Sequence, residues 1–185
     1  MKTYKVTLKS TSAIAFGRKY EFDIPHLDRE TPDDYEKRTW VNRTHFVGDA
    51  VILPPLSIKN ALLGAAKYCG KKIPGQRNKT YSAKFASGVL ITENVVIGKR
   101  SDIRPLWLFV PSDGVSGSGK RVMKCFPTLP AWEGVAKIQV LDEIITGEVL
   151  QEFLTETGNF VGLGALRVQK GGILGRFAVG DVKEV

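Results

Sequence analysis

Short stretches of alternating apolar and polar residues recur along the chain, and two longer stretches repeat with helical spacing instead. Residues 4–8 read tyrosine, lysine, valine, threonine, leucine, which is the two-residue period of a half-buried β-strand. Later apolar runs are rich in β-branched and aromatic residues and are too short for independent helices. The pattern therefore predicts strands at residues 4–8, 51–53, 88–97, 103–110, 122–126, 136–140 and 175–179.

Helical periodicity is found in two places. In the first, Ser57 is positioned to cap a helix whose apolar face continues to Tyr68, and Gly70 is positioned to end it. In the second, residues 142–157 carry apolar side chains on one face and acidic ones on the other, with Gly158 as the expected C-cap. Both helices are expected to pack their apolar faces on a sheet.

Residues 17–48 follow neither period. They are charged and interrupted by prolines, so we expect an inserted segment too irregular for a helix, with a short strand at residues 35–41. Residues 104–126 are expected to form a protruding β-hairpin. The order of elements predicts one α+β domain over residues 1–185, with a ferredoxin-like (RRM-like) split βαβ core and an antiparallel sheet.

The net charge of the chain bears on its binding partner more than on its fold. The chain has 27 Lys and Arg against 19 Asp and Glu, a formal net charge of +8, and a pI near 9.5. Residues 59–84 and 99–124 hold much of the excess. A field of this sign attracts polyanions, which favours nucleic acid as the partner.

Other classes of protein are disfavoured by what the sequence contains. No apolar run approaches the ~20 residues that span a bilayer, and the first residues do not resemble an export signal, so a cytoplasmic protein without membrane contact is expected. The spacing of Cys69 and Cys125 matches no metal knuckle, and reduced thiols are expected there. We expect no metal and no cofactor.

The segment 162–177 is rich in glycine and carries three cations. Glycine lets backbone N–H groups approach a phosphate closely, and Arg167, Lys170 and Arg176 add positive charge at the same place. The alternative is that these glycines only shape the approach to the last strand. The residues alone leave both interpretations open.

Two motifs together carry a resemblance to a known family. The glycine-rich loop, residues 158–176, precedes the last strand of a ferredoxin-like pattern, and the segment Leu-Pro-Pro-Leu-Ser-Ile-Lys-Asn-Ala-Leu at residues 53–62 leads a strand into the first helix. The chain thereby resembles the RAMP superfamily of CRISPR ribonucleoprotein complexes. The Gly-Gly-Ile-Leu-Gly-Arg-Phe ending is similar to that of phage- or plasmid-encoded relatives.

The resemblance implies a non-enzymatic CRISPR-associated subunit that binds single-stranded guide RNA. Copies of it would assemble head-to-tail along the strand, with other CRISPR-like subunits as partners and residues 107–123 as a thumb-like hairpin. RNA would be contacted from the first helix and from the glycine-rich loop. The residues so implied are Ser57, Lys59, Asn60, Arg167, Lys170, Gly171 and Gly172.

Further RNA contacts are expected from cations outside those two motifs and from one aromatic ring. Lys120, Arg121 and Lys124 lie on the expected hairpin, where they can follow a sugar-phosphate backbone. Trp40 is a candidate platform on which a base can stack. The other candidates are Arg18, Lys19, Arg38, Arg43 and Arg176.

Two alternatives come from other functional classes. One is a metal-independent endoribonuclease of the CRISPR-RNA-processing type, with His26 or His45 as the general base. The other is a phage-encoded mimic that inhibits a CRISPR complex by imitating a backbone subunit. The acidic residues of the insertion could hold magnesium, but a solvated acidic loop explains them equally, so no metal is assigned to them.

Overall fold

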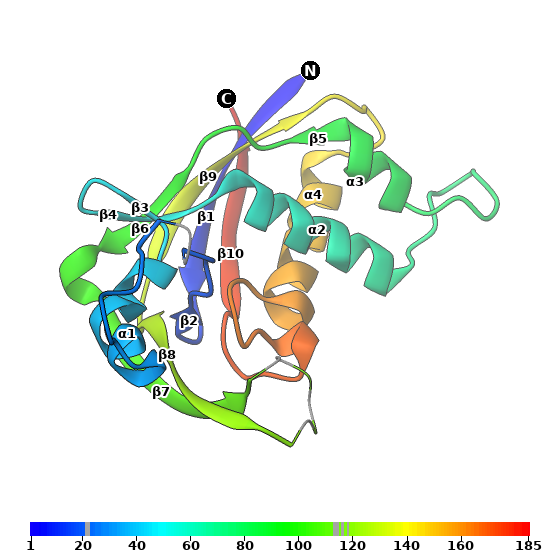
Figure 1. Cartoon of the computed structure of the whole chain (residues 1–185). Helices are drawn as coiled ribbons and strands as arrows, with labels where there is room; N and C mark the ends of the chain where they lie inside the picture. Colours follow the sequence, from blue (N-terminus) through cyan, green and yellow to red (C-terminus); the bar gives the residue numbers. More distant parts are fainter. Residues whose placement is uncertain (21–22, 113–114, 116, 118) are drawn as a thin grey trace.

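A four-stranded antiparallel sheet forms the centre of the protein. The computed structural model describes residues 1–20, 23–112, 115, 117 and 119–185. In this sheet the strand order is β10-β1-β9-β5, and every neighbouring pair is antiparallel. Figure 1 shows β1 in the middle, with β9 and β10 on either side of it. The strands are β1 (Lys2–Ser10), β5 (Val89–Leu90), β9 (Glu133–Val140) and β10 (Phe177–Glu184).

Two helices, α2 (Pro55–Cys69) and α4 (Gly147–Glu156), cover one face of this sheet. The inward side chains of β1, such as Val6 and Leu8, are fully buried in the same core as Leu62 and Phe153 of the two helices. The chain thus runs β1-α2-β5 and then β9-α4-β10. This is the ferredoxin-like split βαβ arrangement, so the fold expected from the sequence is confirmed.

Two small sheets flank the central one. The first has the order β3-β4-β6, and the second has the order β2-β8-β7. β7 and β8 pair without interruption from Arg104↔Thr128 to Pro111↔Arg121, which confirms the hairpin. Four residues of its expected turn-rich tip, at positions 113, 114, 116 and 118, lie outside the described residues. The bounds are β2 (Ile14–Ala15), β3 (Phe46–Val47), β4 (Ala50–Leu53), β6 (Val95–Lys99), β7 (Arg104–Pro111) and β8 (Arg121–Leu129).

The insertion differs from the expectation, because it contains a helix where the sequence pattern predicts none. Helix α1 (Pro32–Thr39) continues into a 3-10 turn, Trp40–Arg43. Thr31 caps it by accepting a hydrogen bond from the Asp34 N–H at 3.2 Å. Pro32 stands at the first helical position, where its missing N–H costs nothing. Proline interrupts a helix in its interior, whereas here it starts one, and no strand forms at 35–41.

Smaller corrections concern where the other helices begin and end. Helix α2 starts at Pro55 after an extended Pro54, so Ser57 lies inside its first turn and is not the cap. Thr146 caps α4, and Gly158 lies within a π-helical turn, Thr157–Val161, that extends it. The strand expected at 88–97 is divided between β5 and β6, and a further helix, α3 (Ser82–Gly88), precedes it. Short 3-10 turns also occur at Arg100–Asp102 and Val168–Lys170.

Candidate nucleic-acid interface

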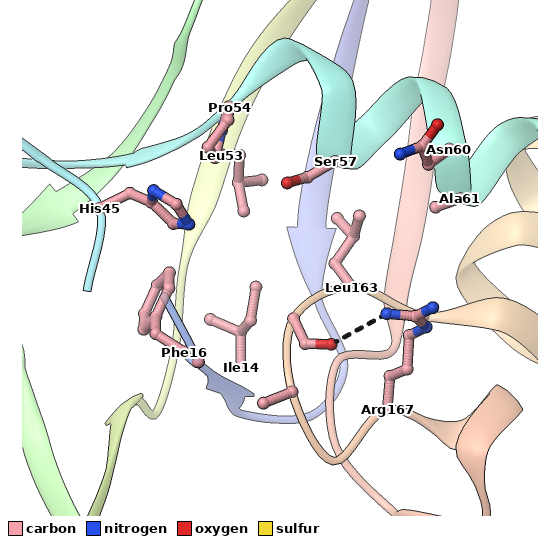
Figure 2. Close-up of a pocket in the computed structure, with 14 residues that line it drawn as sticks. Ile14, Phe16, His45, Leu53, Pro54, Ser57, Asn60, Ala61, Leu163 and Arg167 are labelled. Carbon is pink, nitrogen blue, oxygen red and sulfur yellow. Dashed lines mark hydrogen bonds between the residues drawn. The ribbon is translucent and has the colours of Figure 1, made fainter. Parts of the chain in front are cut away.

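A cleft of about 400 Å³ lies between the start of α2 and the glycine-rich loop. Figure 2 shows α2 above it, the loop with Arg167 at the lower right, and His45 and Phe16 at the left. Its walls combine apolar side chains with four polar ones. They are Ile14, Phe16, Gly17, His45, Leu53, Pro54, Ser57, Asn60, Ala61, Gly162, Leu163, Gly164, Ala165 and Arg167.

The upper wall is set by the way α2 begins. Pro54 is extended and Pro55 takes the first helical position, so the chain turns sharply from β4 into the helix. Ser57 and Asn60 are three residues apart, which places them on one helical face, and both line the cleft. The positive end of the helix dipole lies at the same place, which favours a bound anion.

The lower wall is a loop held rigidly against β2. The Ala165 N–H donates to the Ala15 carbonyl at 2.7 Å, and the Leu163 N–H donates to Gly175 at 2.9 Å. A Cβ on Gly164 would lie 2.2 Å from the Ala15 carbonyl oxygen, so only glycine fits there. For Gly172 the corresponding distance, to the Leu166 carbonyl oxygen, is 1.8 Å. These glycines have a packing role, which was the alternative left open by the sequence. A phosphate-cradling role stays a prediction.

Arg167 is the cation of the cleft. It is half-buried, and its guanidinium donates at 3.4 Å to the Gly164 carbonyl and to the Gln169 side chain. Figure 2 shows it rising from the loop toward Asn60. The preceding residue, Leu166, has φ +56°, a conformation that costs a non-glycine residue about 1–2 kcal/mol. No carboxylate of the described residues lies within ion-pair distance of Arg167, so its charge faces the cleft uncompensated.

His45 lines the same cleft from the opposite side. Burial, and after it the positive charge of Arg18, lower the pKa of His45 from its ordinary value of 6.5. The imidazole is therefore neutral at pH 7 and can accept a proton or a hydrogen bond. His26, the other predicted base, is far more exposed and stacks on Tyr35 with ring centroids 3.9 Å apart.

The three arginines predicted in the insertion are paired with carboxylates. Their shortest nitrogen-to-oxygen distances are 2.6 Å for Arg18–Asp23, 2.7 Å for Arg38–Glu30 and 2.9 Å for Arg43–Glu36. Arg43 is buried and also lies over the Tyr20 ring at 5.2 Å. It is therefore an interior residue and not the surface contact we expected.

The remaining predicted residues are scattered. Lys59 is turned away from the cleft and donates to the Val89 carbonyl at 2.7 Å. Trp40 is half-buried and packs against the core, so only part of its side chain is exposed to a base. Lys120 and Arg121 are exposed near the hairpin tip, and Lys124 is half-buried further down β8. Exposed positions are also found for Lys19, Lys170, Gly171 and Arg176, and Gly172 is half-buried.

The structure thus brings Ser57, Asn60, Arg167 and His45 together. It also adds apolar walls, chiefly Phe16 and Leu163, whose place in the cleft the sequence does not predict. Phe16 becomes part of the cleft only when β2 pairs with β8. Pro54 belongs to the motif at residues 53–62, but the sequence pattern predicts only the end of a strand there.

The described residues contain neither a cluster of metal ligands nor a membrane-spanning helix. No group of three or more His, Cys, Asp or Glu side chains is gathered there in a way that could hold a metal ion. Within the same residues, no helix is long and apolar enough to cross a bilayer.

No family model and no curated protein sequence matches the chain. Solved structures do match it. A chain in the cryo-EM structure of Type III-B Cmr-beta bound to cognate target RNA matches over 100% of this chain, with a TM-score of 0.55 and 12% identity. The chain therefore shares its fold with that Cmr-beta chain. This shared fold agrees with the ferredoxin-like arrangement expected from the sequence.

The chain spans 60% of the length of that Cmr-beta chain. Cmr6 from Pyrococcus furiosus matches over 95% of this chain and 97% of its own, at 12% identity and a TM-score of 0.46. A chain of a CRISPR RNA-guided surveillance complex matches over 83% of this chain and 58% of its own, at 10% identity and a TM-score of 0.34. Scores below 0.5 add nothing to the fold assignment.

Proposed function

We propose that this protein is a non-catalytic subunit that binds single-stranded RNA in the cleft between α2 and the glycine-rich loop. The observation that carries the proposal is the uncompensated charge of Arg167 beside Ser57 and Asn60. A guanidinium at the positive end of a helix suits a phosphate, and the two polar side chains suit a ribose or a second phosphate. The net charge of +8 attracts the strand from a distance.

The assembly we propose is a head-to-tail series of copies along a guide RNA, within a CRISPR-type complex that holds other subunits. Its support is the shared fold with a chain of an RNA-bound Cmr-beta structure. Contacts between identical subunits that do not close into a ring generate an open helical assembly.

The test compares two arginines that differ in their partners. Binding of a fluorescent single-stranded RNA is measured by anisotropy at low and at moderate salt for Arg167→Ala and for Arg38→Ala. Hydrogen bonds to charged groups contribute about 1.5–3 kcal/mol, so we expect Arg167→Ala to weaken binding about 10- to 150-fold. Its salt slope should fall by about 0.7 for each phosphate that the variant no longer neutralises. Arg38→Ala should change little, and equal weakening in both variants would refute the cleft as the binding site.

One observation favours a second candidate, a metal-independent endoribonuclease. His45, neutral at pH 7, faces the same cleft as Arg167, so a base and a cation for a developing negative charge are both present. Incubation of end-labelled RNA with the protein in EDTA separates the candidates. Protection of the RNA supports the binding subunit, whereas cleavage that His45→Ala abolishes supports the enzyme.

A further inference from the structure

Two large aromatic side chains lie exposed and stacked on each other at the C-terminal end of α2. The rings of Tyr68 and Phe160 have centroids 5.8 Å apart and an interplanar angle of 28°. Tyr68 is 67% exposed and Phe160 is 49% exposed. No other ring of the described residues packs against this pair. Clustered exposed apolar surface of this kind marks interaction sites on many proteins, so we sought a binding partner for it.

The backbone presents Phe160 in an uncommon way. Helix α4 widens after Glu156 into the π-helical turn Thr157–Val161, and Phe160 projects from this turn toward Tyr68. Such turns are rare and are often found at functional sites. Its first and last residues, Thr157 and Val161, are buried, so the turn is anchored while Phe160 stays outside.

A strip of four residues runs along one face of α2, from the cleft to the aromatic pair. Ser57, Asn60, Gly64 and Tyr68 succeed one another along one face of α2. The glycine-rich loop borders this strip at Gly64, where an added Cβ would lie 3.3 Å from the side-chain amide nitrogen of Gln169. At ~1.5 Å per residue, the path from Ser57 to Tyr68 spans about 16 Å. A strand that leaves the cleft along α2 therefore reaches the two rings.

Positive charge accompanies the strip. Lys67 and Lys170 are exposed, and the Arg176 side chain donates at 3.2 Å to the Asn159 carbonyl, directly before Phe160. The acidic neighbours are engaged: Glu152 pairs with Lys71, and Glu156 accepts a hydrogen bond from the Cys69 thiol. An aromatic surface bordered by cations suits a nucleobase with its phosphates better than an apolar protein surface.

We infer that Tyr68 and Phe160 form a stacking platform for bases of the same single strand whose phosphates enter the cleft. This inference rests on the proposed RNA binding, and it adds a second point of contact about 16 Å away. Because every base has a π-face, the platform tolerates any sequence.

The experiment places 2-aminopurine at successive positions of a single-stranded RNA and measures its fluorescence and affinity with the wild-type protein and with the Tyr68→Ala/Phe160→Ala variant. Stacking on the platform should quench the probe at one or two positions, and the double variant should abolish that quenching. Affinity for a long strand should fall about 5- to 150-fold per stacked base. Tyr68→Phe, which keeps the ring, should behave as the wild type.

Controls distinguish this inference from the proposed function. Binding of an RNA strand too short to leave the cleft should be weakened by Arg167→Ala but not by the double variant. Suppose that Arg167→Ala weakens the binding of long strands while the double variant changes neither quenching nor affinity. The inference of a stacking platform is then wrong, and the cleft remains the proposed binding site. If neither variant affects binding, both are wrong. If the double variant instead dissociates an RNA-free oligomer in light scattering, the rings contact a second copy and the platform is refuted.

Discussion

The arginines of the insertion and the cations of the C-terminal loop face different surroundings. Arg18, Arg38 and Arg43 each pair with a carboxylate of their own segment. Arg167 and Arg176 donate to backbone carbonyls, and among the described residues no acid pairs with either. Carbonyls orient a guanidinium without cancelling its charge, so the loop presents positive charge and the insertion largely neutralises its own. Charge available to a polyanion therefore depends on local partners more than on the number of cations.

Breaking the buried pair of the insertion should have the largest effect on stability. Glu36 binds Arg43 and also accepts the Cys125 N–H at 2.9 Å, so it ties α1 to β8. Glu36→Ala leaves a buried guanidinium without its carboxylate, and we expect the free energy of unfolding in urea to fall by about 3–5 kcal/mol. Lys37→Ala, at the exposed pair with Asp34, is the control and should cost less than about 1 kcal/mol. RNA affinity of the folded protein should stay unchanged in both, and a large drop in either would show that the insertion contacts RNA.

The shape of the loop should matter next. Gly172→Ala places a methyl group against the Leu166 carbonyl, directly before Arg167, and we expect unfolding free energy to fall by about 1–3 kcal/mol. The neighbouring Gly171→Ala meets nothing within 4 Å, so it shows the cost of φ +79° alone, about 1–2 kcal/mol. RNA binding should weaken for Gly172→Ala, because Arg167 is displaced, and remain for Gly171→Ala. Equal RNA affinity in the two variants would contradict a loop-positioned Arg167.

The smallest effect concerns pH. The Arg38 guanidinium hydrogen-bonds Glu30 and lowers the pKa of that carboxyl from 4.5 to about 2. A carboxyl whose pKa is depressed by folding contributes stability above its unfolded pKa and loses it as pH falls through the folded value. Stability should therefore decline between about pH 5 and pH 2, and Arg38→Ala should flatten that decline. The Glu30 titration followed by NMR gives the pKa directly, and a midpoint near 4.5 in the wild type would contradict the pairing.

The central elements could be predicted because each is encoded locally. The alternation in β1, the apolar face of α2 and Gly70 at its end identify these elements without knowledge of their neighbours. Helix α1 was not predicted although its signals are local too: Thr31 before Pro32, with acidic residues in the first turn and basic ones in the last. The charged, proline-interrupted character of the segment masks this capping pattern.

The candidate site could be predicted only in part. Ser57, Asn60 and Arg167 were found because they belong to the two motifs that carry the family resemblance. Lys59 was placed with them, but residues one step apart on a helix point in different directions, and Lys59 reaches β5. Which arginines are neutralised could not be foreseen, because Glu36 meets Arg43 through α1 and the 3-10 turn that continues it, where the sequence pattern predicts no helix. The exposed position of Phe160 depends on a π-helical turn, which the spacing of apolar residues does not predict.

The central place of β1 governs how the protein can fold. Although it is the first strand in the chain, its two neighbours in the sheet are β9 and β10, formed by residues 133–140 and 177–184. During synthesis β1 must wait, with both edges unpaired, until the residues of β9 and then of β10 have emerged. Pairing at such separation carries a large loop-closure entropy and slows folding. Newly made chains should therefore be vulnerable to edge-to-edge aggregation and should benefit most from a chaperone that shields residues 2–10 early.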